Sequence, residues 1–266
     1  FSKDKSFIYC PINVNSLVSS EHPIKDYSLA YGDLNKSNVL GIVLNYTKTE
    51  DKKLTETTVL LNKSRKPSDS VVSFLGSGNY ASKILIPAFK KSGATLDVIV
   101  TNEGVSGTHH GMANGFHSSS TDIRDALKSD SNIIVIATQH NLHSSQAVQA
   151  LNNGKNVFVE KPLALTKDQL KEVKAAYEKS NQILMVGYNR RFSPHILKMK
   201  SLIDNVKEPK TINMTMNAGY IPKSHWTQSN EIGGGRIIGE ACHYIDLMRH
   251  LVGHCIESYT AIRIND

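Results

Sequence analysis

From residue 70 onward, short apolar runs alternate with segments of helical periodicity. Several of the runs are continuous and rich in β-branched residues, which is typical of strands buried on both faces of a parallel sheet. We predict strands at 71–75, 96–101, 132–137, 156–159 and 183–186. Helices are predicted between them at 80–91, 143–153 and 167–179. This alternation predicts βαβ units, and so an α/β fold with a Rossmann-type, doubly wound parallel sheet over residues 70–187.

After residue 187 the spacing of the elements changes. Helices are predicted at 194–203 and 239–252, and strands at 211–217 and 258–264. A glycine-rich turn at 233–235 lies between them. Residues 188–266 therefore read as the start of a second domain with a sheet of its own.

Residues 1–69 differ from the rest of the chain. One apolar strand is predicted at 39–44, followed by a polar stretch rich in lysine and threonine. That stretch reads as a linker containing one further strand at 57–61. We expect a tail and linker that precede the Rossmann domain.

Composition places the chain among ordinary globular proteins, with 39% hydrophobic and 21% charged residues. No apolar run reaches the roughly 18 residues that a membrane span needs. The first residues lack an apolar signal core, so we expect no export. The three cysteines have no paired spacing, which fits the reducing cytoplasm.

The net charge of +7 raises the question of a nucleic-acid partner. The lysines are scattered among acidic residues, and no arginine-rich block or basic stripe with interleaved aromatics is present. We therefore expect no nucleic-acid partner and interpret the basic balance as attracting anionic cofactors or sugar phosphates.

A glycine turn follows the first Rossmann strand directly, with the pattern G-x-G-x-x-A. The first glycine permits the tight turn, the second lets the backbone approach a pyrophosphate, and the alanine lets the helix pack closely. The helix N-terminus then offers free N–H groups to phosphates. We predict a dinucleotide site here, the alternative being a structural glycine turn. The residues assigned to it are Gly76, Gly78, Asn79, Tyr80 and Ala81.

The end of the second strand normally carries an acid that binds the ribose hydroxyls and favours NAD. Thr101 and Asn102 occupy that place, and Glu103 comes one or two positions late. No arginine stands there to bind a 2′-phosphate. The sequence therefore predicts NAD or NADP without deciding between them.

Lys161 ends a later strand, between Glu160 and Pro162. Proline stops the strand and exposes its neighbours at the carboxyl edge, where ligands of doubly wound sheets bind. We predict that Lys161 hydrogen-bonds a substrate hydroxyl and that Glu160 lies at the cofactor. The alternative is a salt-bridged strand end. Thr138 and His143 follow a strand at the same edge and are assigned to the cofactor groove, although His143 also fits a capping or packing role.

His243 lies on a predicted helix with Glu240 and Asp246 at i−3 and i+3, broadly on one face. A histidine beside a carboxylate can take the proton of a hydroxyl as hydride leaves. The Glu-x-x-His spacing would be half of a carboxylate-bridged metal site, but no second such helix exists. The remaining histidines near Cys255 match no recognised zinc spacing, so we expect no metal.

Five pieces of the chain, in order, resemble the glucose–fructose oxidoreductase, inositol dehydrogenase and rhizopine-catabolism family, written Gfo/Idh/MocA. They are Gly76–Gly78, Ala137–Thr138 with His143, Gly154–Pro162, Gly187–Phe192, and Gly233–Arg236 continued by Cys242–Asp246.

The resemblance implies NAD(P)-dependent oxidation or reduction of a sugar, sugar nucleotide or cyclitol. It implies that Lys161 positions the substrate hydroxyl, that His243 is the acid/base, and that Asn189 and Arg190 lie near the substrate or cofactor. The second domain would be α/β with an open, mainly antiparallel sheet. Because that sheet is commonly the oligomer interface, the resemblance also implies a homo-oligomer.

One departure from the family concerns its D-x-G-x-H pattern. Gly239 stands in the place of the aspartate, and Ala241 in that of the glycine. Glu240 is one position along and is assigned to the substrate side. A helical neighbour points about 100° away, so we expect Glu240 to substitute imperfectly.

The segment 12–46 resembles the last stretch of a medium-chain alcohol dehydrogenase. Zinc ligands and a second glycine turn are missing, so no activity is carried over. This tail, joined to an oxidoreductase, resembles bacterial fusion proteins and implies that the chain is a fragment. Two other functions stay open: a non-catalytic dinucleotide-binding scaffold or sensor, and an enzyme that uses NAD transiently to cleave a glycoside.

Overall fold

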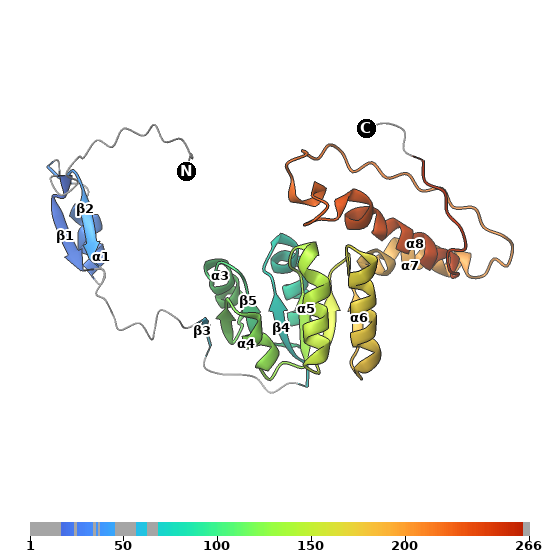
Figure 1. The fold of residues 1–266 in the computed structure, drawn as a ribbon, viewed down its shortest axis with the longest axis horizontal. Helices are drawn as coiled ribbons and strands as arrows, with labels where there is room; N and C mark the ends of the chain where they lie inside the picture. Colours follow the sequence, from blue (N-terminus) through green and yellow to red (C-terminus); the bar gives the residue numbers. More distant parts are fainter. Residues whose placement is uncertain are drawn as a thin grey trace. The chain divides into compact units, whose positions relative to one another are not determined.

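The computed structural model describes residues 17–23, 26–33, 36, 38–45, 57–62 and 69–262. The chain divides into two compact units, Phe1–Glu56 and Thr57–Asp266. In the first unit, strands β1 (Ser20–Pro23) and β2 (Ile42–Asn45) pair in parallel, with helix α1 (Tyr27–Asp33) between them in the chain (Figure 1). The strand predicted at 39–44 therefore runs from Ile42 to Asn45.

The second unit is built on a seven-stranded sheet with the order β3-β6-β5-β4-β7-β8-β9. Every neighbouring pair is parallel except β3 and β6. Strand β4 lies between β5 and β7, so the strand order reverses there, as in doubly wound sheets. The predicted Rossmann-type fold is confirmed. The strands are β3 (Thr58–Leu60), β4 (Val71–Leu75), β5 (Thr95–Val100), β6 (Ser118–Ser120), β7 (Ile133–Ile136), β8 (Asn156–Val159) and β9 (Leu184–Val186).

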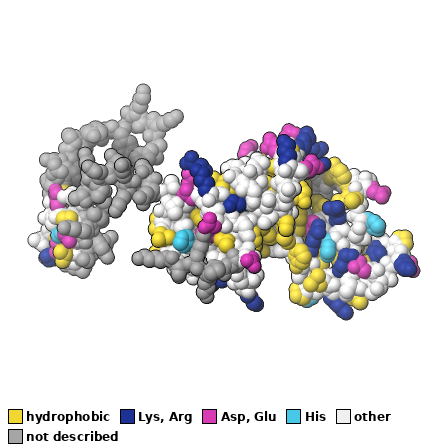
Figure 2. All heavy atoms as spheres, turned by 90° about the horizontal axis from the view of Figure 1, so that it is seen from below, with side chains coloured by type: hydrophobic (Ala, Val, Ile, Leu, Met, Phe, Trp, Pro, Cys, Tyr) yellow, Lys and Arg dark blue, Asp and Glu magenta, His cyan; other side chains and the backbone are white. Residues whose placement is uncertain are grey.

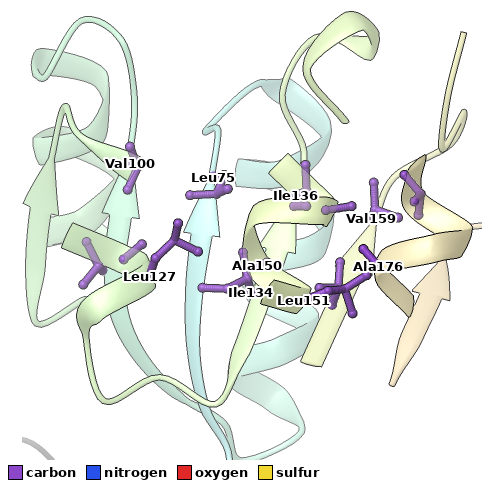
Figure 3. Close-up of a cluster of buried hydrophobic side chains, with 14 residues drawn as sticks. Leu75, Val100, Leu127, Ile134, Ile136, Ala150, Leu151, Val159 and Ala176 are labelled. Atoms are coloured by element: carbon purple, nitrogen blue, oxygen red, sulfur yellow. The ribbon is translucent and has the colours of Figure 1, made fainter. Parts of the chain in front are cut away.

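Helices cover both faces of this sheet, since its buried residues fall into two apolar clusters. One cluster joins the strands to α4 (Ile123–Lys128), α5 (His140–Asn152) and α6 (Lys167–Lys179), as Figure 3 shows. The other joins them to the helix that runs as η3 (Ala81–Leu85) and α2 (Ile86–Lys91). Successive residues of β7 alternate between the two clusters, which explains why its sequence is apolar throughout.

Three elements of this half were not predicted from the sequence. Helices α3 (Val105–Asn114) and α4 flank β6, a strand of three serines. Its serines are buried, and its ladders with β5 and β3 satisfy its backbone. A hydrophobic pattern cannot reveal such a strand. The strand at 57–61 was placed in the linker, whereas β3 is an edge strand of this sheet.

The rest of the chain is helical or irregular and differs from the prediction. Helix α7 (Pro194–Ile203) has the predicted bounds, and a π-helical turn η6 (Ile237–Ala241) leads into α8 (Cys242–Val252). The strands predicted at 211–217 and 258–264 are wrong as far as residue 262, because those residues form no strand. A strand needs a partner for its backbone groups, and none lies among the described residues. The predicted antiparallel sheet is therefore not seen in residues 188–262.

Among the residues that the structure describes, no helix is long and apolar enough to cross a bilayer. On the face of the molecule shown in Figure 2, lysine and arginine side chains lie interspersed with acidic ones.

Candidate functional site: a dinucleotide groove with a lysine and a histidine

The glycine turn after β4 has the geometry that its sequence predicts. Gly76 has a φ of +94°, and a Cβ there would lie 2.5 Å from the carbonyl oxygen of Ala137, so only glycine fits. A Cβ at Gly78 would meet nothing within 4 Å, so this residue faces open space. Ala81 is buried where the helix packs against the sheet. The turn therefore presents an open backbone at the carboxyl edge of β4.

A cavity of about 820 Å³ lies beside this turn and extends to the end of β5 and the start of α5. Among its described lining residues Glu103 is the only charged one. Thr101 is buried, and its hydroxyl lies against α3, where a Cβ at Gly107 would come within 2.6 Å. Asn102 and Glu103 are exposed at the cavity. Glu103, although it comes one or two positions later than the usual acid, is thus the carboxylate available where the ribose hydroxyls are expected.

A second cavity, of about 900 Å³, shares Gly78, Asn79, Ala137 and Thr138 with the first. The two cavities are therefore neighbouring parts of one groove along the sheet edge. The second part brings together most of the predicted site residues from separate elements. They are Gly78, Asn79, Tyr80, Ala81, Thr138, His143, Glu160, Lys161, Asn189, Arg190 and His243.

Lys161 is held by residues of the turn η6. Its ammonium donates to the carbonyl oxygen of Gly239 at 2.8 Å and to Oε2 of Glu240 at 3.2 Å. The side chain is only 16% exposed, so this ion pair is shielded from water. Lys161 therefore does form a salt bridge at the end of its strand, as the alternative interpretation predicts. Its partner is Glu240 of the π-helical turn, and Lys161 also lines the cavity.

Glu240 reaches Lys161 because of the π-helical turn. A π-helix takes i→i+5 hydrogen bonds and so inserts an extra residue into the turn, which changes the direction of the side chains. Glu240, which was assigned to the substrate side, therefore contacts Lys161 and is not turned away as it would be in a regular α-helix. Its second oxygen lies 3.4 Å from the guanidinium of Arg190. Burial raises the pKa of Glu240, but the charge and hydrogen bond of Lys161 outweigh it and bring the pKa below its usual value.

His243 is the second residue of α8, the helix that follows this turn, and is 6% exposed. Burial, and then the charges of Lys161 and Arg190, lower its pKa to about 4, so the ring is neutral at pH 7. Its Nδ1 has no hydrogen-bond partner in the described chain. Asp246, predicted on the same face, pairs instead with Arg191. A neutral imidazole with an unused nitrogen is the form that can accept a proton.

Glu160 lines the groove and has an unpartnered oxygen. Its Oε1 is buried without a partner, and a Cβ at Gly187 would lie 2.7 Å from it. Burial raises the pKa of Glu160 to about 7, although Lys161 opposes this. Nearby, the amide of Asn189 donates to the hydroxyl of Tyr80 at 2.6 Å. This hydrogen bond links Tyr80, next to the glycine turn, to Asn189 in the segment after β9.

His143 lines the second cavity and also makes the contacts of a packing residue, the alternative kept for it. It is 1% exposed, with Nδ1 2.8 Å from the carbonyl oxygen of Pro162 and Nε2 3.1 Å from that of Thr138. Burial lowers its pKa, and a neutral ring donates to only one of these oxygens. His143 therefore ties the end of β7 to the turn that follows Lys161.

His140 and Trp226 are among the groove residues that were not predicted from the sequence. The Nδ1 of His140 lies 2.8 Å from the carbonyl oxygen of Gly233, and burial lowers its pKa to about 4. Trp226 lines both parts of the groove. The only signal was the glycine-rich turn at 233–235, whose contact with His140 bridges 93 residues of sequence. Within the described ranges, no group of three or more His, Cys, Asp or Glu side chains could hold a metal ion.

Taken together, the residues present fit a dinucleotide. Gly78 leaves its backbone open to a pyrophosphate, an acid stands at the ribose position, and Glu160 and His243 offer unpartnered buried atoms farther along the groove. One end of the groove thus suits adenosine and pyrophosphate, and the other suits a reacting group.

Comparison with known proteins agrees with this description. Residues 71–188 match the model of the GFO_IDH_MocA family, described as an oxidoreductase family with an NAD-binding Rossmann fold. Oxidoreductase P35 of Formosa agariphila is 32% identical over 193 residues, which are 67% of this chain and 59% of that protein. The scyllo-inositol 2-dehydrogenase (NAD(+)) of Bacillus subtilis is 36% identical over 47% of this chain and 36% of that protein.

Solved structures give the same result. Levoglucosan dehydrogenase in complex with NADH and L-sorbose superposes with a TM-score of 0.60 at 26% identity, covering 70% of this chain and 53% of that one. The chain thus spans about half the length of that structure, and 36% to 59% of the two curated relatives. The family that the sequence resembles is thus the one whose model residues 71–188 match.

Proposed function

We propose that this chain, whose residues 71–188 carry the NAD-binding Rossmann domain of the Gfo/Idh/MocA oxidoreductases, is the catalytic part of an NAD-dependent dehydrogenase. Its substrate would be a sugar, sugar nucleotide or cyclitol with a hydroxyl to be oxidised, or the corresponding carbonyl. The observation that carries the proposal is that Lys161 and His243 line one cavity beside the open glycine turn.

The proposed chemistry divides between the cofactor and two side chains. A bound nicotinamide supplies the acceptor or donor of hydride. Lys161 donates a hydrogen bond to the substrate oxygen and stabilises negative charge that develops there. His243 is neutral at pH 7 because of its lowered pKa, so it takes the hydroxyl proton when an alcohol is oxidised.

Glu240 and Arg190 would hold Lys161 in position for this chemistry. Glu240 joins the two cations through its two oxygens, which fixes the ammonium of Lys161 at the cavity. The π-helical turn thus compensates for the missing aspartate at position 239 by presenting the neighbouring carboxylate. We infer that Glu240 is a positioning residue, which acts on the substrate by holding Lys161 and does not touch the substrate itself.

Two observations support the choice of substrate and cofactor. Relatives of this chain are named levoglucosan dehydrogenase and scyllo-inositol 2-dehydrogenase, both for polyhydroxylated rings. The adenosine part of the groove carries Glu103 and no lysine or arginine among its described lining residues. A carboxylate binds ribose hydroxyls and repels a 2′-phosphate, which favours NAD over NADP.

The first test is a parallel titration of the protein with NADH and NADPH by calorimetry. We expect NADH to bind at micromolar concentration and NADPH to bind more weakly. Oxidation of polyols and cyclitols is then followed by the absorbance of NADH. Absence of binding by either dinucleotide would contradict the proposal.

Lys161→Ala tests the chemistry itself. We expect turnover to fall about 10²- to 10⁴-fold, the range for a lost catalytic group, with cofactor affinity retained. Lys171→Ala is the matched control, since Lys171 is an exposed lysine on α6 that pairs with Asp168. Near-normal turnover in Lys161→Ala would exclude the assignment. Glycoside cleavage without net NADH would instead favour transient oxidation, and NADH binding without any turnover would favour a scaffold.

Two further proposals concern the parts beyond this domain. We infer that the first unit is the end of a medium-chain alcohol dehydrogenase, for which the parallel pair β1–β2 around α1 is a compatible feature. A homo-oligomer is proposed from the family resemblance alone. Sedimentation of the purified chain tests the second proposal.

A further inference from the structure

The second part of the groove carries more positive than negative charge. The charged side chains among its described lining residues are Glu160, Lys161 and Arg190. Burial raises the pKa of Glu160 to about 7, so this carboxyl is only partly ionised at pH 7. The pKa of His243 is lowered more by Lys161, and more by Arg190, than it is raised by Glu240. The cavity is therefore suited to an anion.

Lys161 and Arg190 share one carboxylate. Oε2 of Glu240 lies 3.2 Å from the ammonium of Lys161, and Oε1 lies 3.4 Å from Nη2 of Arg190. The second distance is long for a hydrogen bond between charged groups. Nε of Arg190 is buried and has no partner in the described chain. A guanidinium has five N–H donors, so the described residues match the charge of Arg190 only in part.

Tyr244 and the turn after β9 hold the guanidinium in position. Arg190 belongs to the 3-10 turn η4 (Asn189–Phe192), and its Cζ lies 4.6 Å from the ring centroid of Tyr244 in α8. A guanidinium over an aromatic ring is attracted to the π-face. The side chain of Arg190 is nevertheless 41% exposed. The guanidinium is thus ordered before a ligand binds, and part of the side chain stays accessible in the cavity.

Three neighbours of Arg190 complete this wall of the cavity. Asn189 offers an amide, Ser193 offers a hydroxyl, and Phe192 offers an aromatic ring. Phe192 is 61% exposed, so its ring has area left to be covered by a ligand. A few polar groups beside an aromatic surface are typical of a small-molecule site. This wall can therefore bind a hydroxylated ring that also carries a negative charge.

We propose that the substrate is a sugar acid whose carboxylate binds to Arg190 while its reacting hydroxyl lies at Lys161. The planar guanidinium presents paired N–H groups that match the two oxygens of a carboxylate. Because Glu240 contacts both cations, a hydroxyl and a carboxylate on one sugar ring can reach them together. The carboxylate is bound and does not react. This inference rests on the proposed function and narrows its substrate class.

Binding to the complex with NADH tests the inference without turnover, because a hydroxyl substrate cannot pass hydride to a reduced cofactor. The probes are D-glucuronate and D-galacturonate, each compared by calorimetry with its uncharged parent, D-glucose or D-galactose. We expect the acid of at least one pair to bind about 10-fold or more tightly than its parent, since it gains hydrogen bonds between charged groups. D-Glucose 6-phosphate carries its charge on a phosphate, and we expect it to bind more weakly than the preferred acid.

Variants of Arg190 assign the preference to its side chain. Arg190→Gln should abolish the preference for the acid over its parent, with the affinity for NADH retained. Arg190→Lys should keep part of the preference, since it retains the charge but not the paired donors. Arg124→Gln is the control, because Arg124 is an exposed arginine of α4 that pairs with Asp122. Circular dichroism checks that each variant is folded.

The outcomes separate this inference from the proposed function. If NADH binds but neither acid binds more tightly than its parent, or if glucose 6-phosphate binds best, the inference is overturned alone. A folded Arg190→Gln variant that keeps the wild-type preference also overturns it. So does one that loses the affinity for NADH equally, because Arg190 would then serve the cofactor. If neither NADH nor NADPH binds, both proposals fail together.

Discussion

The carboxyl of Glu160 is available to a bound group in the groove, but its burial lowers the stability of the folded protein. Its carboxyl is buried, Oε1 lacks a partner, and the pKa lies at about 7 instead of 4.5. The unfolded chain ionises this group freely, whereas the folded chain resists ionisation. The folded state therefore binds the extra proton, and its stability falls as the pH rises from 4.5 through about 7.

Glu160→Gln tests this argument in the protein without cofactor. Glutamine imitates the protonated carboxyl at every pH, so the variant and the wild type should have similar free energies of unfolding below pH 4.5. Above pH 7 the variant should be more stable by on the order of 1–3 kcal/mol. Urea unfolding across this range measures the difference, with Glu172→Gln, an exposed glutamate of α6, as control. A difference that does not depend on pH would contradict the argument.

At the scale of elements, the glycine turn and the π-helical turn each place a group that a regular helix would misplace. The turn at Gly76 depends on a positive φ and a close approach to Ala137, both of which are local requirements. The π-helical turn moves Glu240 onto Lys161, and this could not be predicted from i, i+3 spacing. Its widening coincides with glycine at 239, which packs against His140.

Gly78→Ala tests the open turn. A Cβ at this position meets nothing within 4 Å, so the variant should fold with wild-type stability. The added methyl group projects into the space that a pyrophosphate is to occupy, and affinity for NADH should fall about 10-fold or more. Gly32→Ala in α1 is the control, since its Cβ also meets nothing and it lies in the other unit. Full NADH affinity in Gly78→Ala would mean that the phosphates bind elsewhere.

At the scale of the whole molecule, the groove belongs to one of the two units. Every described residue that lines its two parts lies within Thr57–Asp266, including those contributed by the segment after β9. The first unit supplies none of them. The binding of dinucleotide should therefore be a property of the second unit.

Deletion of residues 1–56 tests this division. Because β3 begins at Thr58 and pairs with β6, the shortened chain keeps the complete seven-stranded sheet. We expect its dissociation constant for NADH to equal that of the full chain. Deletion of residues 1–60 serves as the contrast, because it also removes the edge strand β3 and should lower the melting temperature. Loss of NADH binding on removal of residues 1–56 alone would contradict the division.

The sequence by itself determined what rests on local pattern. Buried strands were recognisable as apolar runs, helices as periodic segments, and the turn at Gly76 as glycine where no other residue fits. Five strands and three helices of the Rossmann domain were therefore predictable to within a few residues, whereas α3 and α4 were not predicted. The place of Lys161 at the carboxyl edge of the sheet also followed, because the carboxyl ends of parallel strands meet there. The same cavity for His243 was implied only by the family resemblance. The serine strand β6 escaped because nothing apolar marks it.

Only the tertiary structure decided how distant segments meet. The pairing of Lys161 with Glu240 joins residues 79 apart in sequence, and that of His140 with Gly233 joins residues 93 apart. Such contacts depend on how the helices and turns pack, which no short stretch of sequence encodes. The same reason explains why the strand predicted at 211–217 is wrong. Its sequence pattern suits a strand, but a strand forms only where a partner strand satisfies its backbone groups.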